Sequence, residues 1–207
     1  MRKMVFPRAL LTLLATTIVV FFALGHAAGQ SYTYRRAITI DHTKVPNTDQ
    51  NSFPVLVSGT YSYLASIANG GKVQSSSGYD IIFTSDASGN TKLDHEIESY
   101  NATTGAVNFW VRIPTVSHTA DTIIYMQYGN SSITTSQENK SGVWQVGYQS
   151  VYHFGSTLGA DSGSAGYGLS QTGTVGSVTG KISGGVSQGM RIFAALLFPP
   201  VRRSDFD

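Results

Sequence analysis

Short runs of alternating apolar and polar residues follow one another along most of the chain, with segments rich in Gly, Asn, Asp and Ser between them. The runs cover residues 34–40, 53–57, 79–84, 92–100, 107–113 and 121–128. Alternation over such short runs is typical of β-strands, and regular turn signals between them favour an antiparallel sandwich. Residues 61–68 have the pattern of a short helix. The pattern therefore predicts an all-β, jelly-roll-like antiparallel β-sandwich.

The fourth and fifth runs predict one hairpin in detail, because each of these strands has one face that is more apolar than the other. With Thr103-Thr104-Gly105 as a three-residue loop, Gly105 takes the left-handed conformation. Burial of the apolar faces selects the register. The polar face then holds a cross-strand ion pair beside a tryptophan. The predicted pairs are Glu96 with Arg112, Glu98 with Trp110, Tyr100 with Asn108, Ile97 with Val111, and Ala102 with Ala106.

The first 29 residues have the three parts of a secretory signal. A basic start precedes an apolar run at residues 9–25, and small residues follow at 27–29. We expect removal of this leader and a secreted, periplasmic or cell-surface location, with no stable membrane insertion afterwards. The alternative is an uncleaved anchor, since the run approaches the roughly 20 apolar residues that span a bilayer.

Composition and charge narrow the classes of function. The formal charge of +2 includes Arg2, Lys3 and Arg8 of the leader, and the remainder has 11 basic and 12 acidic residues, a net charge of −1. This balance argues against nucleic acid as a partner. The chain has no cysteine. Disulfides, thiolate zinc sites, a cysteine nucleophile and a lipid anchor on cysteine are therefore excluded.

The character of the chain changes after Asn130. A polar connector leads to a Gly/Ser/Thr-rich segment, and the last 18 residues carry three arginines, whereas residues 37–189 contain one. We therefore predict a sandwich domain at residues 31–141, a second segment at 144–189 and an aberrant tail at 190–207.

Six ordered motifs resemble the bacterial and archaeal domain of unknown function 2341. The resemblance covers residues 31–141 and implies an exported surface protein, in some members the periplasmic side of a proton channel of the biopolymer-transport type. It implies no established activity. The motifs are Tyr34-Arg35-Arg36-x-Ile38, Phe53-Pro54-Val55-Leu56-Val57, Gly78-Tyr79-Asp80-Ile81-Ile82-Phe83-Thr84, Leu93-Asp94-His95-Glu96-Ile97-Glu98, Trp110-Val111-x-Ile113-Pro114 and Ile124-Tyr125-Met126-x-Tyr128-Gly129-Asn130.

Residues 144–189 resemble the opening of a concanavalin A-like, laminin G-like sandwich. The landmarks are Val151-Tyr152-His153-Phe154 and Asp161-Ser162. About 45 residues are too few to close two packed sheets, so we expect an incomplete second sandwich. A gene fragment or a frame change near Met190 would explain it.

The densest acidic group is Asp94-x-Glu96-x-Glu98, whose carboxylates share one face of a strand. Three interpretations remain open: a hydrogen-bonded or ion-paired solvent face, a ligand contact, and catalysis like that of laminarinase-type glycosidases. Catalysis is the least favoured, because the order of Asp and Glu differs from the E-x-D-x-E pattern of those enzymes. The four histidines of the mature chain lack metal-ligand spacing, so no metal or other cofactor is expected.

The sequence thus predicts a non-catalytic extracytoplasmic module that binds a glycan or a cell-surface protein as part of a larger surface protein. The alternative is a structural or sensory periplasmic domain of a proton-channel protein, and a glycoside hydrolase is less favoured. Aromatic rings and polar groups on one sheet face suit sugar binding. The candidate ligand-binding residues are Trp110, Glu96, Glu98, Arg112, Tyr100 and Asn108.

Overall fold

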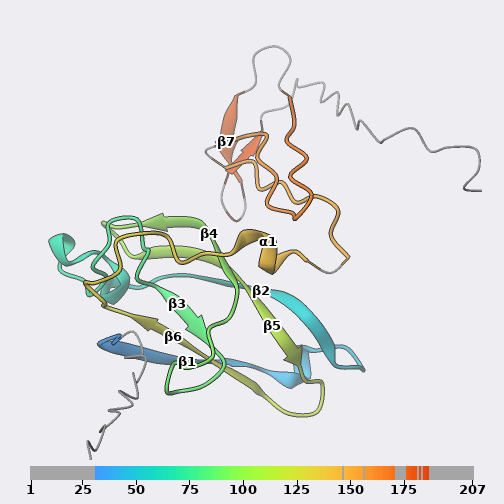
Figure 1. Ribbon diagram of the computed structural model, residues 1–207, viewed down its shortest axis with the longest axis horizontal. Coiled ribbons are helices and arrows are strands. Elements are labelled where there is room, and N and C mark those ends of the chain that lie inside the picture. The colour runs from blue at the N-terminus through green and yellow to red at the C-terminus, as the bar shows by residue number, and fades with distance from the viewer. Residues whose placement is uncertain are drawn as a thin grey trace, which may run out of the picture.

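Residues 34–128 form two antiparallel sheets, which Figure 1 shows as two layers. The computed structural model describes residues 31–145, 147–155, 157–170, 176–180, 182 and 184–186. The predicted all-β antiparallel sandwich is confirmed. One sheet has the order β1-β6-β3, from Tyr34–Ile40, Thr122–Tyr128 and Ile82–Thr84, and the other has the order β2-β5-β4, from Gln50–Thr60, Ala106–Val116 and His95–Asn101.

Helical structure among the described residues is limited to single turns. The helix α1 covers Lys140–Val143, and three 3₁₀ turns cover His42–Lys44, Ser62–Leu64 and Ile67–Asn69. The last two fall where the sequence predicts a short helix. No helix in the described part is long and apolar enough to cross a bilayer.

Beyond the sandwich, Ser177–Thr179 (β7) and Gly184–Val186 (β8) form a separate two-stranded antiparallel sheet. The predicted leader at residues 1–29 and the tail at 190–207 lie outside the described residues, as do several positions between 146 and 189.

The core lies between the two layers and is richest on the central strands. β5 alternates as the sequence predicts, with Phe109, Val111 and Ile113 buried at 0–2% exposure and the intervening residues on the other face. Burial of this apolar area, at about 25 cal/mol per Å², is the main force holding the layers together. The other buried members of the cluster are Leu64, Val73, Ile81, Phe83, Leu93, Val107, Val116, Ile124, Met126 and Tyr128.

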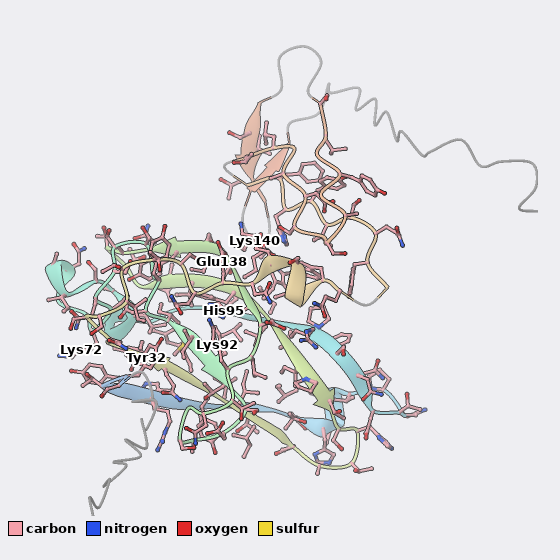
Figure 2. All side chains as sticks on the ribbon, in the orientation of Figure 1. Tyr32, Lys72, Lys92, His95, Glu138 and Lys140 are labelled. Atoms are coloured by element: carbon pink, nitrogen blue, oxygen red, sulfur yellow. The ribbon has the colours of Figure 1, made fainter. Side chains whose placement is uncertain are left out.

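One histidine belongs to this core. His95 is fully buried, with its ring edge-on to Phe83 at 5.7 Å between centroids, and Figure 2 shows it between the layers. Neither ring nitrogen has a hydrogen-bond partner among the described residues. Burial, together with the charge of Lys92, lowers the pKa of His95 to about 4, so the ring stays neutral at neutral pH.

A buried carboxylate shortens the third predicted strand. Asp80 is 0% exposed, and its oxygens accept hydrogen bonds from the backbone N–H groups of Gln74 (2.9 Å), Ser75 (2.8 Å) and Gly129 (3.0 Å). These bonds satisfy a charge that would otherwise be costly to bury. They hold the start of the 79–84 run in a turn, so β3 begins only at Ile82.

The predicted register of the β4–β5 hairpin is wrong. Gly105 is left-handed as predicted, with a φ of 71°, but the loop has four residues because Asn101, not Ala102, faces Ala106. The Asn101 side chain accepts hydrogen bonds from the backbone N–H groups of Thr103 and Thr104 and so stabilises the longer loop. An irregularity between Ile97 and Ser99 then shifts the pairing again. The observed pairs include Tyr100 with Val107, Ser99 with Asn108, Ile97 with Phe109, Glu96 with Trp110 and His95 with Val111.

Candidate functional site

The structure brings five of the six candidate residues to the side of the β4–β5 pair that faces away from the core. We call this side the outer face, formed by Asp94, Glu96, Glu98, Asn108, Trp110 and Arg112. Tyr100 is separated from the others. It pairs with the core residue Val107, packs against the core, and donates its hydroxyl hydrogen to the Leu64 carbonyl at 2.7 Å. The extra residue in β4 reverses the alternation at this point.

The outer face is covered by the chain that follows the sandwich. Residues 139–145, 147–155 and 157–163, here called the downstream segment, cross it beginning with α1, which lies beside β4 and β5 in Figure 1. Glu138 immediately precedes the downstream segment. Its carboxylate accepts a hydrogen bond from the backbone N–H of Ile97, at the edge of the sheet formed by β4, at 3.1 Å. Figure 2 labels it with Lys140. We call the contact between the outer face and the downstream segment the seam.

Glu96 is the centre of the seam. Its side chain is 2% exposed, although it points away from the core. One carboxylate oxygen accepts from the indole N–H of Trp144 at 2.7 Å and lies 3.1 Å from Nε2 of His153. The other accepts from the Ser162 hydroxyl at 2.5 Å and lies 3.9 Å from Nζ of Lys140. A buried carboxylate with this many donors is well compensated.

The charges at the seam stabilise one another. Burial alone would raise the pKa of Glu96, but hydrogen bonds from His153, Ser162 and Trp144 outweigh it and hold the pKa below its ordinary value. Burial would likewise lower the pKa of His153, but the hydrogen bond and charge of Glu96, with the charge of Glu98, raise it. The seam therefore favours an imidazolium against a carboxylate.

Trp110 lies inside the seam and is half-buried. Its indole N–H donates to Glu98 at 2.5 Å, and its ring lies edge-on to Trp144 at 5.2 Å and stacked with His153 at 6.2 Å. Glu98 also approaches Nδ1 of His153 at 3.5 Å. Trp144 and His153 thus cover part of the Trp110 ring on which a sugar ring would stack.

The predicted ion pair between Glu96 and Arg112 is wrong, because the observed register places Arg112 beside Asp94. Arg112 Nη2 lies 2.5 Å from Asp94 Oδ2, and Asn139 donates to the other carboxylate oxygen of Asp94 at 2.8 Å. Asn139 also accepts from the Gly142 N–H and so caps α1. Asp94 thereby fixes the point where the downstream segment leaves the sandwich.

Asn108 lies farther along the outer face and bonds to residues from other parts of the chain. Its amide group bonds Ser99 at 2.7 Å and the Ile182 carbonyl at 2.9 Å, while its oxygen accepts from Ser58 at 2.6 Å. It therefore links β2, β4 and β5 to residues near β8.

A small polar pocket of about 140 Å³ remains at the seam. The acidic and basic groups around it are Glu96, Glu98, Lys140 and His153, with Ser162. A general acid for glycoside cleavage needs a raised carboxyl pKa. Glu96 shifts in the opposite direction.

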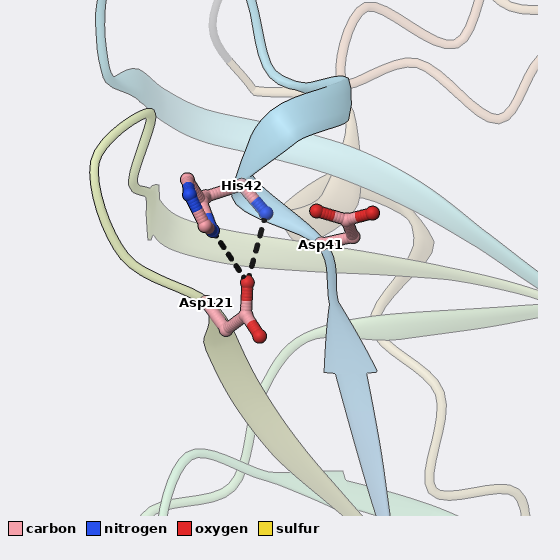
Figure 3. Close-up of side chains that lie close together, drawn as sticks. All are labelled: Asp41, His42 and Asp121. Carbon is pink, nitrogen blue, oxygen red and sulfur yellow. Dashed lines mark hydrogen bonds and ion pairs between the residues drawn. The ribbon is translucent and has the colours of Figure 1, made fainter.

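A second polar cluster lies at the end of β1, as Figure 3 shows. Among the described residues, Asp41, His42 and Asp121 are the group of acidic and histidine side chains close enough to share a metal ion. The contacts are internal: His42 Nδ1 lies 2.7 Å from Asp121 Oδ1, and Asp41 accepts from the N–H and hydroxyl of Thr43. All three are exposed or half-buried. The cluster joins the end of β1 to the start of β6.

Sequence reasoning missed the partners of the candidate residues. It noted Trp144, His153 and Ser162 as parts of a second segment, not as hydrogen-bond partners of Glu96. The available signal was a strand rich in carboxylates, at residues 94–98, followed later in the chain by a segment that contains Trp144 and His153.

Comparison with known proteins supports one part of the resemblance. No curated protein and no solved structure matches the chain significantly. The match to a known family begins before β3, includes β4, β5 and β6, and extends through α1, Trp144 and His153. Over these residues, 77–161, the chain matches the family model of a domain of unknown function, DUF2341, which includes four of the six motifs. The motifs at 34–38 and 53–57 lie outside the match, and the match extends beyond the predicted end at residue 141.

Proposed function

We propose that this chain is a non-catalytic, extracytoplasmic β-sandwich module of a larger surface protein, and that its outer face binds and orients the segment that follows it. The observation that carries this proposal is the buried Glu96 carboxylate, whose donors Trp144, His153 and Ser162 all come from the downstream segment.

The chemistry of the seam supports a fixed orientation. Removing one partner of a buried, hydrogen-bonded charge costs about 3–5 kcal/mol, so other placements of the segment that leave Glu96 unpaired are strongly disfavoured. The aromatic contacts around Trp110 add a second, geometrically specific constraint. Together these contacts would present whatever follows the segment at a defined angle.

The sequence supports the extracytoplasmic setting through the leader at residues 1–29. It also supports the start of a concanavalin A-like, laminin G-like domain at 144–189 as the element that is presented. In this setting the ligand of the whole protein is a glycan or a cell-surface protein, bound by the presented domain or at the seam pocket.

A sensory role in a periplasmic domain is the second candidate, and one observation favours it. Glu96 and His153 have pKa values shifted in opposite directions by contact with each other across the seam. Such a pair makes the strength of docking depend on pH. Hydrolysis receives no comparable support, because the Glu96 pKa shift is opposite to that of a general acid.

Hydrogen exchange of the full chain tests the docking. We expect slow exchange at backbone amides of the downstream segment in the wild type and fast exchange in Trp144→Ala, with β5 protected in both. Tyr167→Ala is the matched control, because Tyr167 is an exposed aromatic outside the seam. Fast exchange of the segment in the wild type would contradict the proposal.

A glycan array probed with the same proteins separates docking from direct glycan recognition. Under the proposal, Trp110→Ala loosens the seam. If Trp110→Ala instead abolishes binding to a glycan while exchange in the downstream segment stays slow, the outer face is a sugar site and its role as a docking face is wrong.

A further inference from the structure

The sandwich is open along one side, between the edge strands β1 and β2. Apolar residues of these strands point between the sheets, but they are incompletely covered. Phe53 is 43% exposed although it pairs with the buried Ile113. Ile38 and Ile40 of β1 and Val55 and Val57 of β2 are half-buried.

This opening is a cleft of about 600 Å³ that reaches the core. Val107 and Met126, both buried core residues, line it, as do the rings of Tyr61 and Tyr63. Sites for small molecules are mostly apolar clefts of about 300–1,000 Å³ with a few placed polar groups. The cleft has the size and the lining of such a site.

Two of the three charged side chains that line the cleft are cationic, those of Arg36 and Lys44, and the third is the carboxylate of Asp41, which accepts hydrogen bonds from the backbone N–H and hydroxyl of Thr43. Arg36 pairs with Met126 and so points between the sheets, where its guanidinium lies 4.1 Å from the centroid of the Tyr63 ring. A hydrogen bond with the Tyr128 hydroxyl raises the pKa of Arg36 above its ordinary value. Lys44 also lines the cleft. Neither Arg36 nor Lys44 forms an ion pair with a described residue.

The neighbouring arginine shows that this placement is not a general property of β1. Arg35 points to the opposite side of the strand, where it donates to the Ala87 carbonyl and lies 5.7 Å from the Tyr125 ring centroid. Two adjacent arginines therefore occupy different environments, and only Arg36 faces the apolar cleft.

We propose that the cleft between β1 and β2 binds a single-chain anionic amphiphile, a long-chain fatty acid, with its alkyl chain between the sheets and its carboxylate at Arg36. The half-buried apolar residues gain burial from the chain, because apolar area leaves water. The guanidinium and the carboxylate form a charge-assisted hydrogen bond at the mouth. This site is separate from the seam and does not depend on the role proposed for it.

Calorimetric titration of the full chain, purified without detergent, tests the chain-length dependence. The probes are octanoate, decanoate and dodecanoate below their aggregation concentrations. Each methylene that enters the cleft should tighten binding about fourfold, since burying one contributes ~0.8 kcal/mol. Equal affinity for all three acids would overturn the proposal, and so would no binding of any of them.

Two adjacent substitutions test the carboxylate contact. Arg36→Gln should weaken dodecanoate two- to fivefold, about the contribution of a solvent-exposed ion pair, and leave dodecanol unchanged. Arg35→Gln removes the same charge from the other side of β1 and should leave both ligands unchanged. Equal effects of the two substitutions would show that the carboxylate does not lie at Arg36.

Filling the cleft tests its position. Val57→Phe and, from the opposite sheet, Ile38→Phe should each weaken dodecanoate more than tenfold while the thermal midpoint is kept. Ile123→Phe changes an exposed apolar residue on the outer side of β6 and should bind as the wild type does. If sedimentation instead finds a dimer that Val57→Phe dissociates, a second copy of the chain occupies the cleft and the fatty-acid site is wrong.

Discussion

Replacing Glu96 with Ala removes the central acceptor of the seam and leaves the core untouched. Trp144 Nε1 and Ser162 Oγ, both buried, lose their acceptor. His153, which is 16% exposed, loses the carboxylate 3.1 Å from Nε2. The residues of β4 and β5 that fill the core lie on the opposite side of the sheet, so the effect should be confined to the docking of the downstream segment.

The expected loss follows from these contacts. Hydrogen bonds from neutral donors to a buried carboxylate contribute about 1.5–3 kcal/mol each, and two are lost outright. Removing the charge also ends its desolvation cost, which offsets part of the loss. We therefore expect the free energy of docking to fall by about 3–5 kcal/mol, enough to detach the segment. Glu96→Gln keeps one acceptor oxygen and should lose less.

Tryptophan fluorescence measures this loss directly, because the chain has two tryptophans and both lie in the seam. We expect the emission of Glu96→Ala to shift to longer wavelength as Trp144, now 4% exposed, meets water. The far-ultraviolet circular dichroism of the sheets should stay unchanged. Asp121→Ala, which removes an exposed carboxylate from a histidine pair elsewhere, is the control. Unchanged emission in Glu96→Ala, or loss of all structure in one transition, would refute the reasoning.

Three further predictions concern pH, a buried carboxylate and two glycines. Docking should be strongest between about pH 4.5 and 6.5: the lowered pKa of Glu96 contributes stability that is lost as pH falls through it, and the raised pKa of His153 contributes stability that is lost as pH rises through it. Tryptophan emission that stays constant from pH 5.5 to 8.5 would contradict this. Asp80→Asn should lower the free energy of unfolding by about 2–4 kcal/mol in urea titrations, since the amide donates where the carboxylate accepts; a loss under ~1 kcal/mol would contradict it. Gly105→Ala should destabilise the fold more than Gly70→Ala, although both glycines have φ between 71° and 81°. The Cβ added at Gly105 would lie 2.0 Å from the Tyr61 carbonyl oxygen, whereas a Cβ at Gly70 would meet open space. Equal thermal midpoints of the two variants would show that the contact relaxes.

The strands could be predicted from sequence because burial alone imposes their alternation. Phe109, Val111 and Ile113 face the core as predicted, and the adjacent residues face away. Strand ends were less predictable. The alternation of the third run is continuous from Tyr79, but the Asp80 carboxylate accepts a hydrogen bond from the backbone N–H of Gly129, 49 residues later in the chain. Alternation carries no information about such a contact.

The hairpin register failed for a local reason. A three-residue and a four-residue loop both place Gly105 in the left-handed conformation, so the glycine could not distinguish them. The Asn101 side chain decides between them by accepting from two loop N–H groups. The irregularity after Ile97 then restores the burial of that residue on the core side. The extra loop residue pairs Tyr100 with Val107 instead of Asn108 and so turns Tyr100 toward the core. The irregularity adds a second one-residue shift, and the two together place Arg112 beside Asp94 instead of Glu96.

The alternation of a strand shows which side chains share the outer face, but it does not show which part of the chain covers that face. Three carboxylates at alternate positions of a strand indicate a solvent face or a ligand face when the strand itself supplies no hydrogen-bond donors for them. In the structure the donors to Glu96 lie 48 to 66 residues later in the chain, in a segment that has little regular structure of its own. A charged strand face near the end of a sandwich is therefore also a site at which the following chain can dock. The distinguishing sequence feature is a nearby downstream segment that supplies indole, imidazole and hydroxyl donors, because only such donors make burial of the carboxylate favourable.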